Sequence, residues 1–288
     1  MIFHQPVLLD EVIKLLNPRK GDIFFDATLG HGGHTISLLR HGATVFGLDA
    51  DKNNLTFTTQ RIAKLNLSAT FHPLRGNFKN LKKIWQKYIN LPLDGLIFDL
   101  GLSSSQQSSQ NRGFSFNDQL SLDMRLNTSR QKTTAEKIIN TAPEEELFTI
   151  FSKISQEKYS RPLAQRIIRQ RQRQPIKSGY DLAQIIRSFY NAKKITSHHD
   201  PATKIFMALR ITVNHEFANL NQALQASLDT VKTNGRVVVI TFHSGEDRLV
   251  KNFIRNSHLK STKLSPSRNE IKNNPLSRSA HLRSYTIN

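Results

Sequence analysis

The stretch Ile23-Phe-Phe-Asp-Ala-Thr-Leu-Gly-His-Gly-Gly-His34 decides the fold of this 288-residue chain. It begins as a short apolar run and continues as a glycine-rich turn, and residues 35–40 after it have a helical pattern. A second apolar run, Thr44-Val-Phe-Gly-Leu-Asp49, follows that predicted helix. Two such strands joined by a helix form a right-handed βαβ unit, which requires a parallel sheet.

Two further apolar runs, Leu93–Asp99 and Arg236–Phe242, extend the predicted sheet. They are continuously apolar rather than alternating, which is typical of strands buried on both faces. Residues 282–287 are expected to add a late edge strand. The sequence therefore predicts an α/β protein with a doubly wound sheet.

The region between about residues 109 and 201 contains helical patterns but no convincing strand. A polar stretch rich in serine and glutamine precedes it and is too long for an ordinary βα connection. After it, apolar residues recur every three or four positions from Ile205 to Leu228, which predicts one long amphipathic helix. We therefore expect a discontinuous domain at residues 1–108 and 202–288, interrupted by an inserted all-helical domain at residues 109–201.

The formal charge of +19, from 41 Lys and Arg against 22 Asp and Glu, indicates a polyanionic partner. An evenly spread, solubilising charge is the alternative, and the distribution argues against it. Residues 158–177 include seven basic side chains and no acidic one, and residues 248–283 include nine against Glu270 alone. Such clusters favour binding to nucleic-acid phosphates.

The chain contains no cysteine, which excludes disulfides and thiolate metal sites and indicates a reducing compartment. We expect neither export nor a membrane anchor, because residues 1–10 lack the pattern of a signal peptide and no later run approaches about 18 apolar residues. The adjacent His198 and His199 rarely converge on one ion in a loop, so no metal site is expected. We therefore expect a cytoplasmic protein with no membrane partner.

The glycine-rich loop would let the backbone approach a bound adenosine cofactor, and Asp49 lies where a carboxylate accepts hydrogen bonds from ribose. A nicotinamide dinucleotide is the alternative cofactor, but that pattern places a third glycine where this chain has Thr35. Asp26 would repel a pyrophosphate, whereas it would tolerate the cationic sulfonium of S-adenosylmethionine. The loop therefore favours S-adenosylmethionine.

Further candidates follow the other strands or lie in the polar loop. Asp99 could accept a hydrogen bond from an exocyclic amine and so help it to attack, could hold the cofactor, or could cap the next turn. Phe114 and Phe116 could stack on a flipped base or form a small satellite core. His243 could line the site, while Ser244 could cap the following helix.

Nine motifs occur in order along nearly the whole chain: His4-Gln-Pro-Val-Leu-Leu, Asp26-Ala-Thr-Leu-Gly-His-Gly-Gly-His34, Asp99-Leu-Gly-Leu-Ser-Ser, Arg112-Gly-Phe-Ser-Phe116, Leu122-Asp-Met-Arg125, Pro201-Ala-Thr, Ala208-Leu-Arg-Ile-Thr-Val-Asn214, Phe242-His-Ser and Arg278-Ser-Ala-His-Leu-Arg283. Together they closely resemble the RsmH (MraW) family of small-subunit ribosomal RNA cytosine-N4 methyltransferases. The resemblance implies a Rossmann-like methyltransferase domain with a helical insertion. It also implies methyl transfer from S-adenosylmethionine to N4 of a cytidine in the decoding region of small-subunit (16S-type) ribosomal RNA.

The resemblance further implies cofactor contacts at Gly32, Gly33, His34, Asp49, Phe78, Asp99 and Gln106. Five residues depart from the usual family pattern: Ser121 for Pro, Asp200 for His, Lys204 for Arg, Met207 for Gln and Gly245 for Leu. These departures concern RNA docking more than cofactor binding. Neither the motifs nor the composition indicates an oligomeric state.

We therefore expect an RNA methyltransferase that acts on an assembled or late-assembly small ribosomal subunit. Asp99 would align the N4 amine, with Phe114, Phe116 and His243 in the base pocket, and the two basic stretches would hold phosphates. A ribosome-assembly protein that binds RNA and has lost activity is the alternative of a different class. That alternative is disfavoured by the intact residues Asp26, Gly32, Asp49 and Asp99.

Overall fold

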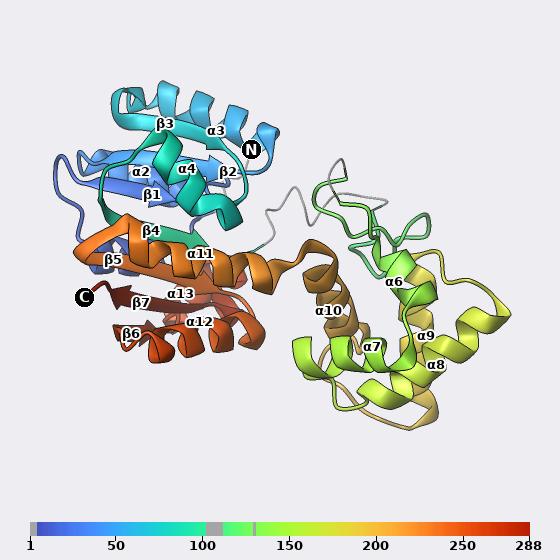
Figure 1. The fold of residues 1–288 in the computed structure, drawn as a ribbon. Coiled ribbons are helices and arrows are strands. Elements are labelled where there is room, and N and C mark those ends of the chain that lie inside the picture. The colour runs from blue at the N-terminus through green and yellow to red at the C-terminus, as the bar shows by residue number, and fades with distance from the viewer. Residues whose placement is uncertain (1–4, 102–111, 129–130) are drawn as a thin grey trace. The chain divides into compact units, whose positions relative to one another are not determined.

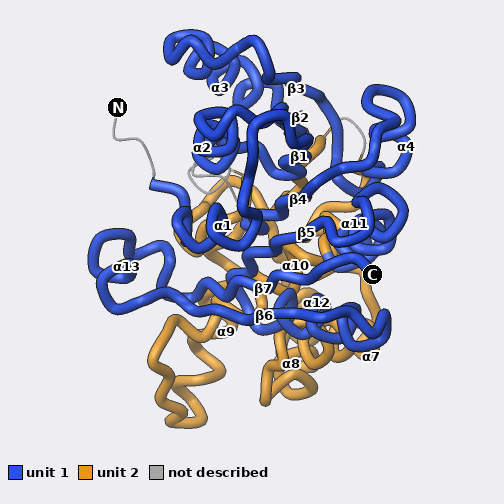
Figure 2. The backbone as a smooth tube through the Cα atoms, turned by 90° about the vertical axis from the view of Figure 1, so that its left-hand side faces the viewer, with its two compact units in different colours: residues 1–101, 217–288 blue, residues 102–216 orange. Residues whose placement is uncertain are grey.

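The computed structural model describes residues 5–101, 112–128 and 131–288. Its contacts divide the chain into two compact units, which are coloured separately in Figure 2. Unit 1 comprises residues 1–101 and 217–288, and unit 2 comprises residues 102–216. Among the described residues, no helix is both long enough and apolar enough to cross a membrane.

Unit 1 is built on a seven-stranded sheet with the order β3-β2-β1-β4-β5-β7-β6 (Figure 1). The strands are β1 (Ile23–Asp26), β2 (Thr44–Asp49), β3 (Phe71–Arg75), β4 (Leu93–Asp99), β5 (Val231–Thr241), β6 (Lys260–Leu264) and β7 (His281–Thr286). Strands β1 to β5 run parallel, and β7 runs antiparallel to both β5 and β6. The carboxyl ends of the parallel strands therefore meet at one edge, where open α/β sheets bind their ligands.

Helices cover both faces of this sheet. One core cluster contains side chains of α1 (Leu9–Leu16), α2 (Gly33–Arg40) and α3 (Lys52–Lys64). The opposite cluster contains side chains of α4 (Leu81–Tyr88), α11 (Glu216–Thr230) and α12 (Ser244–Asn256). The short elements η1 (Ser68–Thr70), η2 (Phe78–Asn80), α13 (Arg268–Asn273) and η4 (Pro275–Ser279) complete the unit.

Successive strand residues pack alternately into these two clusters. Phe24 contributes to the cluster with α1 and Phe25 to the cluster with α4, and in β5 Val238 and Val239 divide in the same way. All four side chains are fully buried. The continuous apolar runs are thus strands covered on both faces, and the predicted α/β fold with a doubly wound, Rossmann-like sheet is confirmed.

The expectation that residues 282–287 form an edge strand is wrong. Strand β7 lies between β5 and β6, and it pairs with β5 from Arg236↔Thr286 to Thr241↔His281. The strand at that edge is β6, whose first four residues are exposed. The apolar residues of β7 are buried because Leu282 and Tyr285 pack into the core clusters on the two faces of the sheet.

Unit 2 consists of helices around their own core. They are α6 (Ala135–Thr141), α7 (Glu144–Thr149), the π-helical turn η3 (Ile150–Ile154), α8 (Ser160–Arg173), α9 (Gly179–Ala192) and α10 (Ala202–Asn214). Leu163, Ile167, Leu182 and Ile186 are fully buried in this core. Within residues 112–128 and 131–216 the structure contains no strand, in agreement with the expected all-helical insertion.

The single long helix expected from Ile205 to Leu228 is wrong, because the chain breaks at His215. That residue has a left-handed backbone (φ 53°) and ends α10, after which α11 begins. The apolar residues of α10 pack into the core of unit 2, whereas those of α11 pack against the sheet. The contacts therefore group residues 202–216 with the helical unit, which differs from the expected boundary after residue 201. The other expected boundary, after residue 108, lies outside the described residues.

Candidate functional site

The loop after β1 is held in place by the buried side chain of Asp26, which is 2% exposed. Its Oδ1 accepts a hydrogen bond from the backbone N–H of Thr28 (3.1 Å), and its Oδ2 accepts one from the hydroxyl of Thr35 (2.7 Å). Burial raises the pKa of the Asp26 carboxyl, although these two hydrogen bonds act in the opposite direction. The residue that replaces the third glycine of the dinucleotide pattern, Thr35, therefore ties the start of α2 to β1.

The three glycines of the loop are needed for different physical reasons. A Cβ atom on Gly32 would lie 2.4 Å from Cγ2 of Thr58, and one on Gly33 would lie 2.2 Å from Cγ of Pro6. A Cβ atom on Gly30 would meet no atom closer than 3.8 Å. Close packing within the protein is thus sufficient to explain Gly32 and Gly33, and Gly30 is the glycine that faces open space.

The Gly32→Ala substitution should lower the free energy of unfolding by about 2–4 kcal/mol. The backbone there is left-handed (φ +74°), and the added methyl group would overlap Thr58. Thr58→Ser in the same protein should restore part of the loss, because it removes Cγ2 and keeps the hydroxyl that donates to Gly30 O (2.7 Å). Urea unfolding of the unmodified protein and of these two variants measures both effects.

Gly21→Ala is the matched control for this prediction. Gly21 also has a positive φ (+90°), but a Cβ atom there would have nothing within 4 Å. Its substitution should therefore cost only the backbone strain. Equal losses of stability in Gly21→Ala and Gly32→Ala would show that contact with Thr58 is unimportant.

Asp49, at the end of β2, connects three segments at the sheet edge. Its Oδ2 accepts hydrogen bonds from Gly30 N (3.0 Å) and Asn54 Nδ2 (3.1 Å), and its Oδ1 accepts one from Asp51 N (2.8 Å). Burial raises the pKa of the Asp49 carboxyl, and these hydrogen bonds partly offset that effect. A carboxylate has about four acceptor positions, so one remains for a ligand hydroxyl.

Asp99 and His34 form the centre of the candidate site. The backbone N–H of Asp99, the last residue of β4, donates to the hydroxyl of Thr28 (2.6 Å), and Nε2 of His34 lies 3.5 Å from Asp99 Oδ2. Both ring nitrogens of His34 and Oδ1 of Asp99 are buried without a hydrogen-bond partner among the described residues. Because buried polar atoms in proteins are nearly always paired, these atoms indicate a place for a ligand beside the described residues.

His243 follows β5, the neighbour of β4, and has a similar unpaired atom. Its Nδ1 accepts a hydrogen bond from Glu246 N (3.3 Å) and so caps α12, which shows that the expected cap by Ser244 is wrong. In the neutral ring the proton is therefore on Nε2. That atom has no hydrogen-bond partner among the described residues, although Oε1 of Glu246 lies 3.2 Å away.

Two supporting residues are missing from the predicted set. Thr28 positions the backbone of Asp99, and Glu246 holds the turn before α12 by accepting a hydrogen bond from Phe242 N (2.9 Å). Thr28 lies inside the glycine-loop motif, and Glu246 lies three residues after His243. The available signals were the position of Thr28 inside a motif and that of Glu246 just after one.

Phe78 and Gln106 are the remaining predicted cofactor contacts. Phe78 begins η2 after β3 and packs edge-on against Phe98, with ring centres 6.0 Å apart. Its half-buried ring is close to the core beneath the sheet edge. Gln106 lies outside the described residues.

The predicted aromatic pair, Phe114 and Phe116, lies in unit 2. Both rings are half-buried against the core of that unit, and Phe116 packs edge-on against Phe206 at 4.8 Å. The guanidinium of Arg187 lies 5.9 Å from the centre of the Phe116 ring. Core packing is therefore what the contacts of Phe116 show, and base stacking by either ring stays a prediction.

The segment around these aromatics is closely hydrogen-bonded. Asp123 accepts two side-chain hydrogen bonds from Arg125 (2.6 and 2.7 Å), which hold the pKa of its carboxyl below the ordinary value. Arg112 donates to the carbonyl of Arg125. Ser121, where the family usually has proline, accepts a hydrogen bond from Asp123 N (3.2 Å) and so belongs to the same network.

Three other departures from the family pattern also take part in contacts. Asp200 pairs with Arg187 (Nε to Oδ2, 2.9 Å), and Lys204 lies 3.8 Å from the buried carboxylate of Glu157. A Cβ atom on Gly245 would lie 2.6 Å from Cζ of Phe217, so a leucine there would require that ring to move. Nothing in the structure explains Met207.

Comparison with known proteins assigns the chain to a family. The sequence model of the MraW methylase family matches residues 1–287. The chain belongs to the MraW methylase family. Ribosomal RNA small subunit methyltransferase H of Carboxydothermus hydrogenoformans is 41% identical over 253 residues, covering 88% of this chain and 80% of that protein. Its counterpart from Ehrlichia chaffeensis is 37% identical and covers 97% of this chain and 98% of its own.

Membership in the MraW methylase family identifies the protein as an S-adenosylmethionine-dependent methyltransferase. The predicted family, enzyme class and cofactor are thereby confirmed, and the nicotinamide alternative is wrong. Among solved structures, an rRNA methylase from Streptococcus thermophilus aligns with a TM-score of 0.49 at 12% identity, over 100% of this chain and 98% of that one. That likeness is too weak to bear on function.

Proposed function

We propose that this MraW-family methyltransferase methylates N4 of a cytidine in the decoding region of small-subunit ribosomal RNA. It acts in the cytoplasm on an assembled or late-assembly small ribosomal subunit. The names of the relatives, which refer to small-subunit ribosomal RNA, support the substrate. The observation that carries the site assignment is the set of buried atoms on His34, Asp99 and His243, at the carboxyl edge of the sheet, for which the described residues provide no hydrogen-bond partner.

The residues of unit 1 fit an adenosine cofactor at this edge. Asp49 has an acceptor position left for a ribose hydroxyl, and the half-buried ring of Phe78 offers an apolar surface for the adenine. Gly32, Gly33 and His34 at the start of α2 hold the loop beside it. When bound, S-adenosylmethionine supplies an electrophilic methyl group.

Asp99 aligns the N4 amine of the cytidine for its attack on the methyl group. The N4 lone pair of cytosine is delocalised into the ring, so the amine is a poor nucleophile. Oδ1 of Asp99 accepts a hydrogen bond from N4–H, which favours a tetrahedral nitrogen and gives the proton released on methylation a nearby acceptor. His243 lies on the neighbouring strand end, where its Nε2–H can donate to the base, with Phe114 and Phe116 as the proposed stacking surface.

The basic stretch of residues 158–177 holds RNA phosphates through part of its side chains. Arg161 is paired with Glu145 (Nη2 to Oε2, 3.1 Å), and Arg171 donates to the carbonyls of Ile139 (2.8 Å) and Ala142 (2.7 Å). These contacts tie both arginines to unit 2, although those of Arg171 use only its Nη1. We assign the phosphate contacts first to the other members of the stretch: Lys158, Arg166, Arg169, Arg173 and Lys177.

A labelling experiment tests the proposed reaction. The protein is incubated with methyl-labelled S-adenosylmethionine and unmodified small subunits, and the label is located by nucleoside mass spectrometry. We expect label in N4-methylcytidine, and none when the subunits already carry the methyl group. Label in another nucleoside would contradict the assigned atom, and RNA binding without any label would favour the inactive assembly protein. Naked RNA as a parallel substrate tests the requirement for an assembled subunit.

A further inference from the structure

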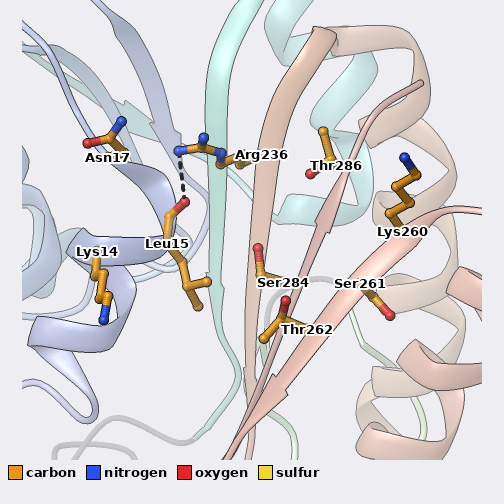
Figure 3. Close-up of a pocket in the computed structure, with 9 residues that line it drawn as sticks. All are labelled: Lys14, Leu15, Asn17, Arg236, Lys260, Ser261, Thr262, Ser284 and Thr286. Carbon is orange, nitrogen blue, oxygen red and sulfur yellow. Dashed lines mark hydrogen bonds between the residues drawn. The ribbon is translucent and has the colours of Figure 1, made fainter.

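Unit 1 contains a cavity of about 400 Å³ that is separate from the sheet edge described above (Figure 3). It lies between the end of α1 and the antiparallel strands β5, β7 and β6. Arg236 lines it from the middle of β5, opposite Gly95 near the start of β4, and Thr286 lines it from the last residue of β7. Since His243 follows the carboxyl end of β5, the cavity and the candidate site lie at different positions along the same strand.

Basic and hydroxyl side chains make up most of the lining of this cavity, and Leu15 and Asn17 complete it. Lys14, Arg236 and Lys260 contribute three positive charges, and no described residue of the lining carries a carboxylate. No described carboxylate forms an ion pair with either lysine, and both lysines are exposed. An uncompensated group of three cations around one cavity favours an anionic ligand.

The strand register brings hydroxyl groups beside these cations. Thr286 pairs with Arg236 on one side and with Lys260 on the other, so these three side chains share one face of the sheet. In the same way, Thr262 pairs with Ser284 two residues further along. Hydroxyl and cationic side chains on one face are the usual donors to phosphate oxygens.

Arg236 also removes the main obstacle to an anion at this place. The carbonyls at the end of a helix carry partial negative charge and would repel a phosphate. Nη1 of Arg236 donates to the carbonyls of Leu15 (3.2 Å) and Leu16 (3.3 Å), the first of which is drawn in Figure 3. The described residues use only this one nitrogen of the guanidinium, so its other N–H groups remain for a ligand.

We propose that this cavity binds a backbone phosphate of the RNA substrate, with Lys14, Arg236 and Lys260 as its cations. The ligand is a phosphodiester rather than a small free anion, because the proposed substrate is a polyanion and the chain carries a charge of +19. The site deepens the proposed function and rests on it. It contributes to holding the RNA and takes no part in methyl transfer.

The test is the double variant Lys14→Gln/Lys260→Gln, which leaves the helix-capping Arg236 in place. Lys83→Gln/Lys87→Gln is the matched control, since both of those lysines are exposed on α4, which packs on the other face of the sheet. Binding to small subunits is measured by filter retention between about 0.05 and 0.3 M salt. Inorganic phosphate binding is followed by NMR, and kcat and KM are measured with methyl-labelled cofactor.

The cavity variant should bind subunits about 4- to 10-fold more weakly at 0.15 M salt, and the slope of log Kd against log salt should fall by about 0.7–0.9. We expect a higher KM, an unchanged kcat and no such effect in the control. Unchanged affinity and slope, or an equal loss in the control, would overturn the proposal. Loss of inorganic phosphate binding with full RNA affinity would overturn it in favour of a free anion. Because binding is measured without turnover, failure of the methylation reaction itself would be recognised separately.

Discussion

Asp99→Asn should lower kcat for methyl transfer by about 100- to 1,000-fold, the range expected when a charged group that acts in the transition state is lost. The substitution keeps the size of the side chain and the backbone hydrogen bond to Thr28. It removes the negative charge beside His34 and replaces one acceptor oxygen with a donor. Single-turnover methylation of small subunits measures the change directly.

A measurement of cofactor affinity and a control variant distinguish alignment of the amine from cofactor binding as the role of Asp99. Calorimetry should show cofactor affinity within about threefold of the unmodified protein, because alignment of the amine is a step after binding. A large loss of cofactor affinity with an unchanged single-turnover rate would instead mean that Asp99 holds the cofactor. Asp94→Asn is the matched control, since Asp94 is at the other end of β4, where it accepts a hydrogen bond from Ile23 N (2.7 Å).

Asp49→Ala should weaken binding of S-adenosylmethionine by about 1.5–3 kcal/mol, or roughly 10- to 150-fold in Kd. The loss has two physical sources. The ribose loses an acceptor, and the loop loses the hydrogen bonds that Gly30 N and Asn54 donate to the carboxylate. Asp49→Asn keeps one acceptor oxygen and should give an intermediate Kd by calorimetry.

The neighbouring Asp51 provides the control for charge and for loop stability. It caps α3 by accepting a hydrogen bond from Asn53 N (2.8 Å). Asp51→Ala should reduce stability by about 1 kcal/mol and leave the cofactor Kd nearly unchanged. If Asp49→Ala and Asp51→Ala weakened the cofactor equally, the ribose assignment of Asp49 would have to be abandoned.

The central strands could be predicted from sequence because both of their faces are covered. Phe24 and Phe25 point to opposite clusters and are equally buried, so the apolar signal is continuous. Strand β3 has one buried residue among five and contains Pro73, and the first four residues of β6 are exposed, so neither carries such a signal. Strand β7 lies inside the sheet only because β6 pairs with its outer side. Since β6 could not be predicted, the interior position of β7 could not be predicted either.

The break at His215 could not be predicted from periodicity. Both α10 and α11 have an apolar stripe, and the two stripes are in phase along the sequence. They face different cores, however, and the turn between them is held by tertiary contacts. Asn214 donates to Met124 O (2.8 Å) and accepts from Leu126 N (2.8 Å), and Arg210 pairs with Glu216 (2.9 Å). The spacing of apolar residues along a sequence shows which positions are buried, but it does not show which of two cores buries them.

At the candidate site, sequence reasoning identified the acidic residues that end the strands, because strand ends in parallel sheets meet at one edge. It did not identify why each loop residue is needed. The contacts of Gly32 with Thr58 and of Gly33 with Pro6 join residues far apart in sequence. Likewise, the basic stretch did not reveal that Arg161 donates to Glu145 and that Arg171 donates to backbone carbonyls of unit 2. Charge density is visible in a sequence, whereas the partner of each charge is not.

The pairing of β4 with β5 has a consequence for how the protein is made. Residues 100–230 separate these neighbouring strands along the chain, so β4 leaves the ribosome long before its partner does. At about 5–20 residues per second, synthesis of that segment takes roughly 7 to 26 seconds. During this time one edge of an apolar strand has no neighbour and can pair with another chain. The long separation of β4 and β5 therefore leaves the edge of β4 exposed in the nascent chain, where it can cause aggregation. We expect a chaperone that binds β4 during this time to increase the yield of folded enzyme.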